Sequence, residues 1–376
     1  MTASWKACAV DSVYSFSIKR SPPIRKAVYE WVKKMVEWKV SDSWDEENSW
    51  LLEGRTVLIF KGGDRKDPAK YRPSTCLPTI TKMVTLAIHK RMRGWLFGMV
   101  ERSIQENEQR GVRSSQGCKE AAIENLASNM KKKREENEVI ELDNDIQKEY
   151  DNDNHAFLEN LLSVYGFPPG IKIPNIEMMA RWKIQLSKGA KKEVGDVRLT
   201  NGIIQGDALS PLLFVLMIDP LIKIDKRRVG EGVEVLFYVD DMKASSSGIQ
   251  IAQTVVHIMK RYSASVGMVI NAKKSAIQLN FETPLPQSLQ EIPRLDESTD
   301  KYLGFEMKRG EIDMKQMMMK RLEERIKEKL EEPTRRVGSF ESRNWVQYVN
   351  QNVMNVVRFF NRPSGSPSGG LTETTR

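Results

Sequence analysis

The sequence predicts a mixed α+β protein in which β-prone runs alternate with amphipathic helical segments. Residues 55–60, RTVLIF, and 232–239, GVEVLFYV, are rich in β-branched and aromatic residues, which favour strands. Residues 21–40, SPPIRKAVYEWVKKMVEWKV, repeat apolar side chains at helical spacing after two prolines suited to a helix start. The chain of 376 residues is 40% hydrophobic, so it can bury a substantial core, and we expect more than one lobe.

The chain is basic, which favours a polyanionic partner such as a nucleic acid. Its 59 Lys and Arg residues exceed its 50 Asp and Glu residues and give a net charge of +9. Cys8, Cys76 and Cys118 have no metal-ligand spacing and cannot all pair, which indicates a reducing compartment. The sequence shows no bilayer-crossing apolar run and no signal-peptide centre in its first twenty residues. We therefore expect a soluble, intracellular protein, nuclear or cytoplasmic, with no membrane partner; the sequence does not specify its oligomeric state.

The N-terminal elements follow from apolar spacing and from glycine and proline signals. We expect the helix at residues 21–40 to dock on the core through its apolar stripe, with a membrane or partner surface as the alternative. The stripe consists of Ile24, Val28, Trp31, Val32, Met35 and Val36. The strand at 55–60 then leads into a basic loop, KGGDRKDPAKYRP at 61–73, and a helix at 79–97.

The later elements are predicted in the same way. A short strand at 139–142 and helices near 154–165 and 251–268 precede YLGFEM at 302–307, which predicts one short strand. An amphipathic helix follows, whose apolar stripe we expect to pack in a core and not to bind a ligand. The stripe is formed by Met314, Met318, Leu322, Ile326 and Leu330. Residues 361–376 have too little apolar surface to fold.

Two adjacent carboxylates, Asp240 and Asp241, follow the β-prone run that ends at Val239. A tight turn there would join strands at 233–239 and 242–245 into a hairpin with both acids at its tip. Close carboxylates ionise together only if a cation such as Mg²⁺ offsets their repulsion, so the pair indicates a metal site. A solvated turn without function is the alternative.

A third carboxylate, Asp145, is the candidate partner of this pair. It lies in VIELDNDIQKEYDNDNH, where acids again follow a β-prone run. The three acids would converge if their strands are neighbours in one sheet, and three carboxylates can hold the two Mg²⁺ ions of an in-line phosphoryl displacement. The alternative is a solvated acidic loop, because the segment is rich in acids throughout.

A glycine-containing turn and a helix start lie between these acids, in NGIIQGDALSPLLFVLMIDPL at 201–221. Asp207 or Ser210 can cap the helix, and Pro211 suits its first turn. Free backbone N–H groups at such a start can bind a phosphate or a base, although a purely structural capped helix has the same sequence signals.

Seven segments occur in a defined order along the chain: LIFKGGDRKDPAKYRP, EQRGVRSSQGCKEA, DIQKEYDNDNH, GIIQGDALSPLLF, FYVDD, GMVINAKKS and YLGF. In this order they resemble two fingers motifs and five palm motifs of the reverse transcriptases of non-long-terminal-repeat (LINE-type) retrotransposons, which are related to group II intron maturases. The likeness spans residues 51–307. Several ordered motifs are far more specific than any one of them.

The resemblance implies an α+β right-hand polymerase with fingers, a helical thumb and a palm of antiparallel strands backed by helices. We then expect an N-terminal helical arm at 1–50, fingers and palm at 51–308, a thumb-like region at 309–360 and a disordered tail at 361–376. The implied activity is RNA-directed DNA polymerisation with two Mg²⁺ ions, or Mn²⁺. The implied partners are an RNA template, a DNA primer or target, and deoxynucleoside triphosphates.

The resemblance also implies roles for single residues. Asp145, Asp240 and Asp241 would bind the metals, and Tyr150 would be the steric gate that excludes a ribose 2′-OH. The nucleotide-binding set would be Lys61, Arg72, Tyr150, Gln205, Gly206 and Lys274. The primer grip would be formed by Tyr302, Leu303 and Gly304.

Some residues depart from the pattern of the family. Ser74, Glu149 and Asp153 replace small or apolar residues, and we expect Asp143 to place a buried, unpaired charge beside Asp145. The alternative function is therefore a catalytically degenerate, nucleic-acid-binding remnant of the same kind of element, and we expect the chain to be a fragment of such an element. An intron maturase is less favoured, because no maturase-like extension follows the thumb-like region.

Overall fold

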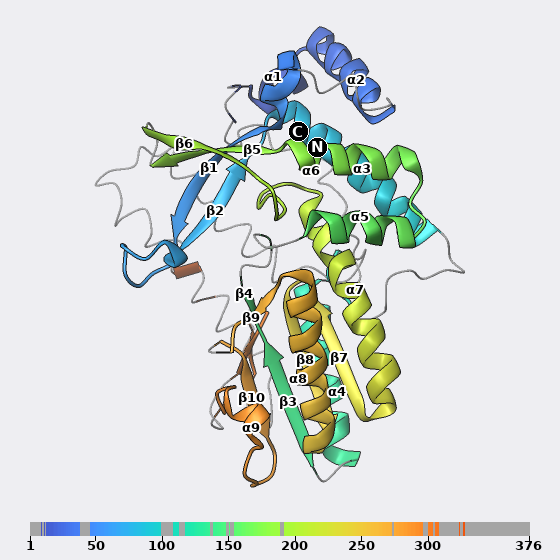
Figure 1. Ribbon diagram of the computed structural model, residues 1–376, viewed down its shortest axis with the longest axis vertical. Coiled ribbons are helices and arrows are strands. Elements are labelled where there is room, and N and C mark those ends of the chain that lie inside the picture. Colours follow the sequence, from blue (N-terminus) through green and yellow to red (C-terminus); the bar gives the residue numbers. More distant parts are fainter. Residues whose placement is uncertain are drawn as a thin grey trace.

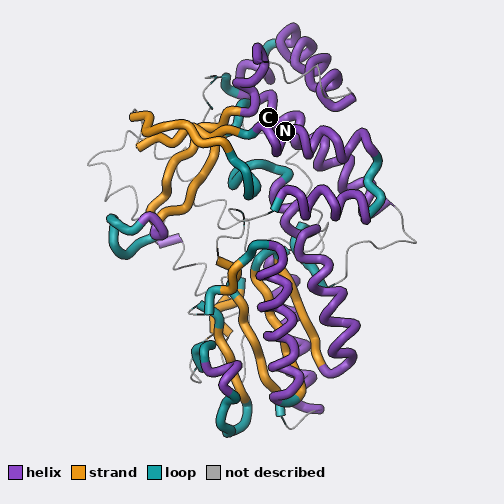
Figure 2. The backbone as a smooth tube through the Cα atoms, viewed as in Figure 1, coloured by secondary structure: helices purple, strands orange, loops and turns teal. Residues whose placement is uncertain are grey.

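The computed structural model places two four-stranded sheets in different parts of the molecule, with helices packed beside both (Figures 1 and 2). The residues that it describes are 13–37, 46–98, 108–112, 117–135, 138–147, 154–188, 192–272, 274–295, 300–303 and 305–307, with the single residues Ala9, Asp11, Tyr150, Glu323, Ile326 and Lys327. The expected thumb-like region and tail lie outside the described residues apart from the last three of these. The predicted domain boundaries therefore remain predictions.

The first sheet contains the predicted strand at 55–60. Its order is β2-β1-β5-β6, formed by β1 (Glu53–Phe60), β2 (Tyr71–Cys76), β5 (Lys183–Lys188) and β6 (Lys192–Arg198). β1 runs antiparallel to β2 and parallel to β5, and the buried hydroxyls of Thr56 and Thr75 are 2.8 Å apart across the first pair.

The prediction that a loop extends to Pro73 was wrong for its last residues. A short 3₁₀ helix, η3 (Pro68–Lys70), ends the loop, and Tyr71, Arg72 and Pro73 belong to β2. β2 is an edge strand, where a proline is tolerated because the missing N–H is not needed by a further strand. Pairing with β1 overrides the local proline signal.

A group of helices lies beside this sheet: α1 (Ser15–Arg20), α2 (Pro22–Glu37), the 3₁₀ helix η2 (Glu46–Leu52), α3 (Thr79–Gly98), α5 (His155–Val164) and α6 (Pro169–Arg181). The predicted helices at 79–97 and 154–165 are present. α2 docks on the core through Met35 and Val36, whereas Ile24 at its other end is 44% exposed. The apolar stripe of α2 is therefore buried mainly in the C-terminal half.

The second sheet is fully antiparallel and contains the strands that carry the acidic motifs. Its order is β10-β3-β8-β7, formed by β10 (Ala276–Leu279), β3 (Val139–Asn144), β8 (Asp241–Ser247) and β7 (Val233–Tyr238). Helices α7 (Ser210–Val229) and α8 (Ile249–Val266) cover the face turned to the viewer in Figure 1, and α4 (Cys118–Glu135) lies behind.

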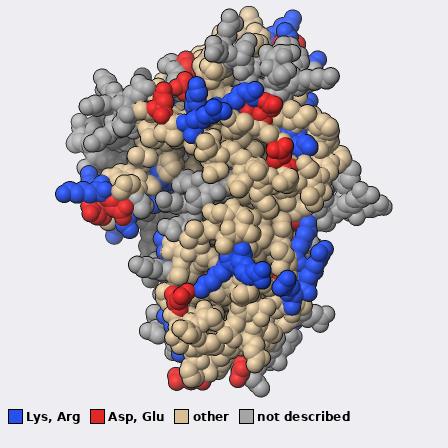
Figure 3. Space-filling model, in the orientation of Figure 1, with Lys and Arg blue, Asp and Glu red and all other residues tan. Residues whose placement is uncertain are grey.

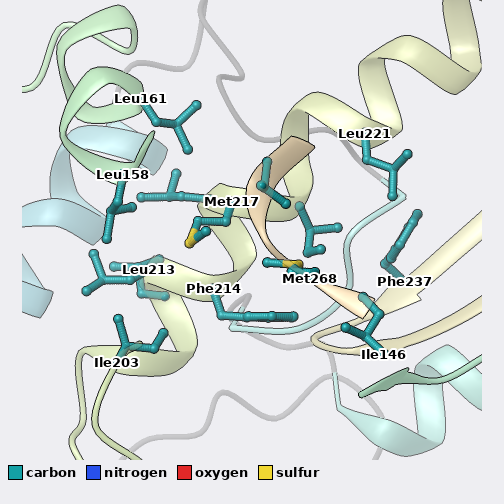
Figure 4. Close-up of a cluster of buried hydrophobic side chains, with 14 of the residues drawn as sticks. Ile146, Leu158, Leu161, Ile203, Leu213, Phe214, Met217, Leu221, Phe237 and Met268 are labelled. Atoms are coloured by element: carbon teal, nitrogen blue, oxygen red, sulfur yellow. The ribbon is translucent and has the colours of Figure 1, made fainter. Parts of the chain in front are cut away.

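The core of this half is built around α7, whose apolar side chains point in several directions. Leu213, Phe214, Met217 and Leu221 of α7 are fully buried, and Figure 4 shows them among side chains from other elements. Those partners include Ile146, Leu158, Leu161, Ile203, Phe237 and Met268. A helix that is apolar on most sides is expected where packing surrounds it, as here.

The remaining elements are short. They are β4 (Ile146–Gln147), β9 (Val269–Ile270), the 3₁₀ helix η4 (Gly230–Gly232), α9 (Gln287–Gln290), β11 (Asp300–Tyr302) and β12 (Phe305–Met307). The prediction of one strand at 302–307 was wrong, because β11 and β12 are two antiparallel strands. The chain reverses at Leu303, whose φ of +48° is incompatible with an extended strand.

None of the described helices combines the length and the apolar character that crossing a bilayer requires.

Candidate active site

The predicted hairpin is present, and it places Asp240 and Asp241 at one end of the second sheet. β7 and β8 pair antiparallel, and the last pair of the ladder is Tyr238 with Asp241. Only Val239 and Asp240 lie between the paired residues, so they form a two-residue turn. Such turns favour a positive φ, and Val239 has a φ of +59°.

The third acid, Asp145, reaches the same end from the neighbouring strand. β3 pairs antiparallel with β8, and the last pair of this ladder is Asn144 with Met242. Continuing the register by one residue places Asp145 opposite Asp241. Residues directly opposite in an antiparallel pair share one face of the sheet, so both carboxylates lie on the same face.

The charges of Asp240 and Asp145 both act on Asp241. The Asp241 side chain keeps contact with solvent, yet partial burial, then the charge of Asp240, then that of Asp145, raise its pKa to about 6, and Lys243 opposes this shift. Carboxylate oxygens are the ligands preferred by hard divalent cations, and a cation would relieve the repulsion that raises this pKa. The donor chemistry of the three acids therefore fits a divalent metal.

Asp145 is held by its own neighbours. Its Oδ2 accepts a hydrogen bond of 3.0 Å from Asn271 Nδ2 and lies 3.8 Å from the Nζ of Lys274. Its backbone N–H donates to the hydroxyl of Ser275 at 3.2 Å. In the part of the chain that the structure describes, no three His, Cys, Asp or Glu side chains are gathered into a group that could hold a metal ion.

The expectation that Asp143 is unpaired was wrong. Its Oδ2 lies 2.6 Å from the Nζ of Lys243, which is directly opposite on β8. Local sequence signals could not indicate this partner, because the two residues are 100 positions apart. The extra acid beside Asp145 is therefore compensated within the sheet.

Tyr150 lies against α7 and the loop that precedes it. The Tyr150 ring packs on Phe214 with ring centroids 5.4 Å apart, and its carbonyl accepts a hydrogen bond from the N–H of Ile203 at 2.7 Å. Two residues further along that loop, the carbonyl of Gln205 accepts from the N–H of Thr75 in β2 at 2.8 Å. The loop thus joins the first sheet to α7.

Gly206 is needed for this junction. Its φ is +116°, and a Cβ atom there would lie 2.5 Å from the carbonyl oxygen of Thr75. The next residue, Asp207, is buried and accepts hydrogen bonds from the Thr85 hydroxyl at 2.6 Å and from the N–H of Ala208 at 2.7 Å. Burial raises the pKa of Asp207 to about 6 despite these bonds. The prediction that Asp207 or Ser210 caps α7 was wrong: the N-cap residue is Leu209, and it makes no side-chain cap bond. Asp207 binds the N–H of Ala208, which precedes the helix, and Ser210 donates to the carbonyl of Ile204.

Lys61 and Arg72 lie on the β1–β2 hairpin, and both are exposed. The Lys61 N–H donates to the Lys70 carbonyl at 2.8 Å, which closes the loop between the strands. This loop projects at the left edge of the molecule and carries acidic as well as basic side chains (Figure 3). Among the described residues, the structure shows no ion pair from Lys61 or Arg72 to Asp145, Asp240 or Asp241, so it does not bring the two sets together.

The predicted primer grip is only partly described. Tyr302 ends β11 and Leu303 forms the turn that follows, whereas Gly304 lies outside the described residues. Two residues of interest were not predicted from sequence: Asn271, which binds Asp145, and Gln109, which binds Val239. Gln109 lies within the segment EQRGVRSSQGCKEA, and that position was the only signal available.

Comparison with known proteins relates the chain to retrotransposon proteins. It is 23% identical over 231 residues to the Retrovirus-related Pol polyprotein from type-1 retrotransposable element R2 of Popillia japonica, covering 59% of this chain and 31% of that protein. The protein of the same description from Nasonia vitripennis is 25% identical over 277 residues, covering 67% of this chain and 26% of the relative. The chain thus spans less than a third of the length of these relatives.

Solved structures support the fold. The telomerase from Candida albicans, in complex with the TWJ fragment of telomeric RNA, matches with a TM-score of 0.52 at 11% identity, covering 91% of this chain and 64% of that chain. The apo telomerase from Candida tropicalis, truncated from its C-terminal domain, matches with a TM-score of 0.51 at 12% identity, covering 69% and 53%. This likeness confirms the predicted α+β right-hand polymerase fold.

A family model described as reverse transcriptase (RNA-dependent DNA polymerase) matches residues 61–307, a span that holds all of the second sheet, the strands β2, β5 and β6 of the first sheet, and all three acids. As the order of its motifs predicted, the chain belongs to the reverse transcriptase family.

Proposed function

We propose that the chain is the RNA-directed DNA polymerase domain of a non-long-terminal-repeat retrotransposon protein of the R2 kind, with Asp145, Asp240 and Asp241 as its catalytic acids. The observation that carries this proposal is the register of β3, β8 and β7, which ends with Asn144 opposite Met242 and Tyr238 opposite Asp241, so that all three acids adjoin one end of the sheet. The similarity to the R2 proteins supports the retrotransposon origin.

The three acids would hold two divalent cations, Mg²⁺ or Mn²⁺. When bound, such ions lower the pKa of the primer 3′-hydroxyl and stabilise charge on the attacking and leaving oxygens. Within this site the acids fix where the primer end is placed, and Asn271 fixes the Asp145 carboxylate through its hydrogen bond of 3.0 Å. Lys274, 3.8 Å from Asp145 and 66% exposed, is suited to meet the charge of the departing pyrophosphate.

The remaining residues would bind the nucleotide and choose it. Lys61 and Arg72 would neutralise the triphosphate when the β1–β2 hairpin closes over it, since both are exposed and cationic. Tyr150 would exclude the ribose 2′-OH, because Phe214 packs against its ring and limits its movement. Gln205 and Gly206 would line the nucleotide and template pocket, where the fit of Gly206 against Thr75 holds the loop in place. Tyr302 to Gly304 would contact the primer.

The substrates follow from these roles: an RNA template, a DNA primer or target, and deoxynucleoside triphosphates. The test is primer extension on RNA and DNA templates with Mg²⁺ or Mn²⁺, run beside filter binding. We expect Asp240→Asn to abolish extension and preserve binding, because it removes a ligand charge without changing side-chain size. The matched control is Asp196→Asn, which changes an exposed acid on β6 and should leave extension intact.

Two outcomes would count against the proposal. Extension that survives Asp240→Asn would show that the acids are not the metal ligands. An unmodified chain that binds primer-template but does not extend it would indicate a degenerate remnant. The ion pair between Asp143 and Lys243 removes one of the sequence arguments for such degeneration.

A further inference from the structure

A short segment that belongs to none of the named strands runs beside β7. In this segment, residues 108–112, the N–H of Arg110 donates to the carbonyl of Phe237 at 2.7 Å. The N–H of Phe237 in turn donates to the carbonyl of Glu108 at 2.9 Å, and Gln109 and Phe237 form a parallel bridge. The segment therefore extends the edge of the palm sheet, and its backbone pairing ends two residues before the turn that carries the acids.

The side chain of Gln109 continues the hydrogen bonding where the backbone pairing stops. Its Oε1 accepts from the N–H of Val239 at 2.9 Å, and its Nε2 donates to the carbonyl of the same residue at 3.3 Å. A carboxamide has the same donor and acceptor as a peptide group, so it binds both backbone groups of Val239 as a strand would. The Gln109 residue is 0% exposed, so water does not compete for these bonds.

The residue bound in this way has a strained backbone. Val239 has a φ of +59°, a left-handed value that is rare for any β-branched residue. Gly111 is fitted against it: a Cβ at Gly111 would lie 2.6 Å from Val239 Cγ2 and 2.7 Å from Val239 N. The N–H of Gly111 also donates to Gln109 Oε1 at 2.8 Å, which fixes the amide.

We propose that Gln109, seated by Gly111, is a positioning residue that holds Val239 in its left-handed conformation and so fixes the direction of Asp240 and Asp241. The next two residues of the chain are these acids, and a rotation about the Val239 φ would swing both carboxylates relative to Asp145. The effect on catalysis rests on the proposed function of the acids, whereas the effect on the turn does not.

The first measurement is hydrogen–deuterium exchange of peptides that cover residues 236–242. We expect Gln109→Ala to raise exchange there on the order of tenfold, because the Val239 N–H loses its acceptor. The matched control is Asn175→Ala, which removes another fully buried amide, from α6, and should leave exchange at 236–242 unchanged. Unchanged exchange at 236–242 in a folded Gln109→Ala protein would overturn the proposal.

Gln109→Met covers the case in which Gln109→Ala does not fold. It keeps the length of the buried side chain and leaves no large cavity, but it removes both the acceptor for the Val239 N–H and the donor to the Val239 carbonyl. We expect it to fold and to raise exchange at 236–242, and an unchanged value would again overturn the proposal.

The second measurement separates positioning from a merely structural role. Gly adopts positive φ at little cost, so Val239→Gly should make the left-handed turn less dependent on Gln109. We expect Gln109→Ala to weaken Mn²⁺ binding, measured by electron paramagnetic resonance, and to lower the extension rate at saturating primer-template. Adding Val239→Gly should recover part of both losses. If Gln109→Ala binds Mn²⁺ normally and adding Val239→Gly recovers no extension rate, Gln109 has only a structural role.

The two proposals fail in different ways. If Asp240→Asn alters neither Mn²⁺ binding nor extension, the proposed function of the acids is wrong while the exchange result still decides whether Gln109 holds the turn. If Asp240→Asn abolishes both but Gln109→Ala changes nothing, the acids are catalytic and the positioning proposal is wrong.

Discussion

The carboxylate of Asp143 and the ammonium of Lys243 lie 2.6 Å apart and face each other across the β3–β8 ladder, near the end of the sheet that carries the acids. The Lys243 side chain is 5% exposed and that of Asp143 is 24% exposed, so the pair is largely shielded from water. A charge buried in this way is tolerated only because its partner is present. The pair lies on the same face of the sheet as the acids of the candidate active site.

Removing one partner of this pair should be costly. We expect Lys243→Met to lower the free energy of unfolding by roughly 3 kcal/mol, because Asp143 loses the ammonium group that lies 2.6 Å from its carboxylate in a mostly buried position. Urea unfolding at pH 7 measures the loss. Adding Asp143→Leu should recover much of it, since two apolar residues can replace a buried pair. Equal stability of the single and double variants would show that the pair is not coupled.

Replacement by leucine should have opposite effects on protein stability at two buried aspartates of α7. Asp225 is 0% exposed and neither of its carboxylate oxygens has a hydrogen-bond partner in the structure as described, and burial raises its pKa to about 7. Asp219 is equally buried, but its Oδ2 lies 2.6 Å from Lys223 Nζ and accepts from the Tyr165 hydroxyl. We expect Asp225→Leu to stabilise the protein at pH 8 and Asp219→Leu to destabilise it.

The pH dependence of the Asp225 effect has a definite sign. The folded state keeps the Asp225 proton up to about pH 7, whereas the unfolded chain loses it near the ordinary value of 3.8. The folded state therefore binds more protons between these values, and the unmodified protein loses stability as pH rises through that window. The gain from Asp225→Leu should therefore grow by about 4 kcal/mol between pH 4 and pH 8. A gain that does not change with pH would contradict the raised pKa.

Sugar selection tests the position of Tyr150. We expect Tyr150→Ala to admit ribonucleotides and to leave Mn²⁺ binding intact, because it removes a steric block and no metal ligand. The measurement is the ratio of extension rates with deoxynucleotides and ribonucleotides. Phe214→Leu serves as a comparison, because it removes the ring that packs on Tyr150 and should relax the ratio only in part. An unchanged ratio in an active Tyr150→Ala enzyme would remove Tyr150 from the nucleotide site.

Nucleic-acid binding should be driven by the backbone phosphates and should not depend on catalysis. The chain carries a net charge of +9, and Lys61, Arg65, Lys66 and Arg72 are exposed on the β1–β2 hairpin. We expect affinity to fall steeply as salt rises, because binding releases condensed counterions. Filter binding over a salt series measures the slope. The slope of affinity against salt should be the same for Asp240→Asn. A flat slope would argue against phosphate contacts.

The sequence by itself determined the elements whose signals are local. β1, β7, α3, α5 and α8 follow from runs of β-branched residues or from apolar spacing, and each is present in the structure. The hairpin with Asp240 and Asp241 was predictable for the same reason, because strand propensity ends where the acids begin. The ordered motifs identified the family without any knowledge of how the strands pair.

Only the tertiary structure decided the features that depend on residues far apart in the chain. β2 forms despite Pro73 because it pairs with β1 at a sheet edge. Asp143 is compensated by Lys243, and Val239 is held by Gln109 across 130 positions. No periodicity or turn signal encodes such contacts, because they arise from the register of strands brought together on folding. The sequence thus supplied the acids, and the register of the palm sheet decided which residues surround them.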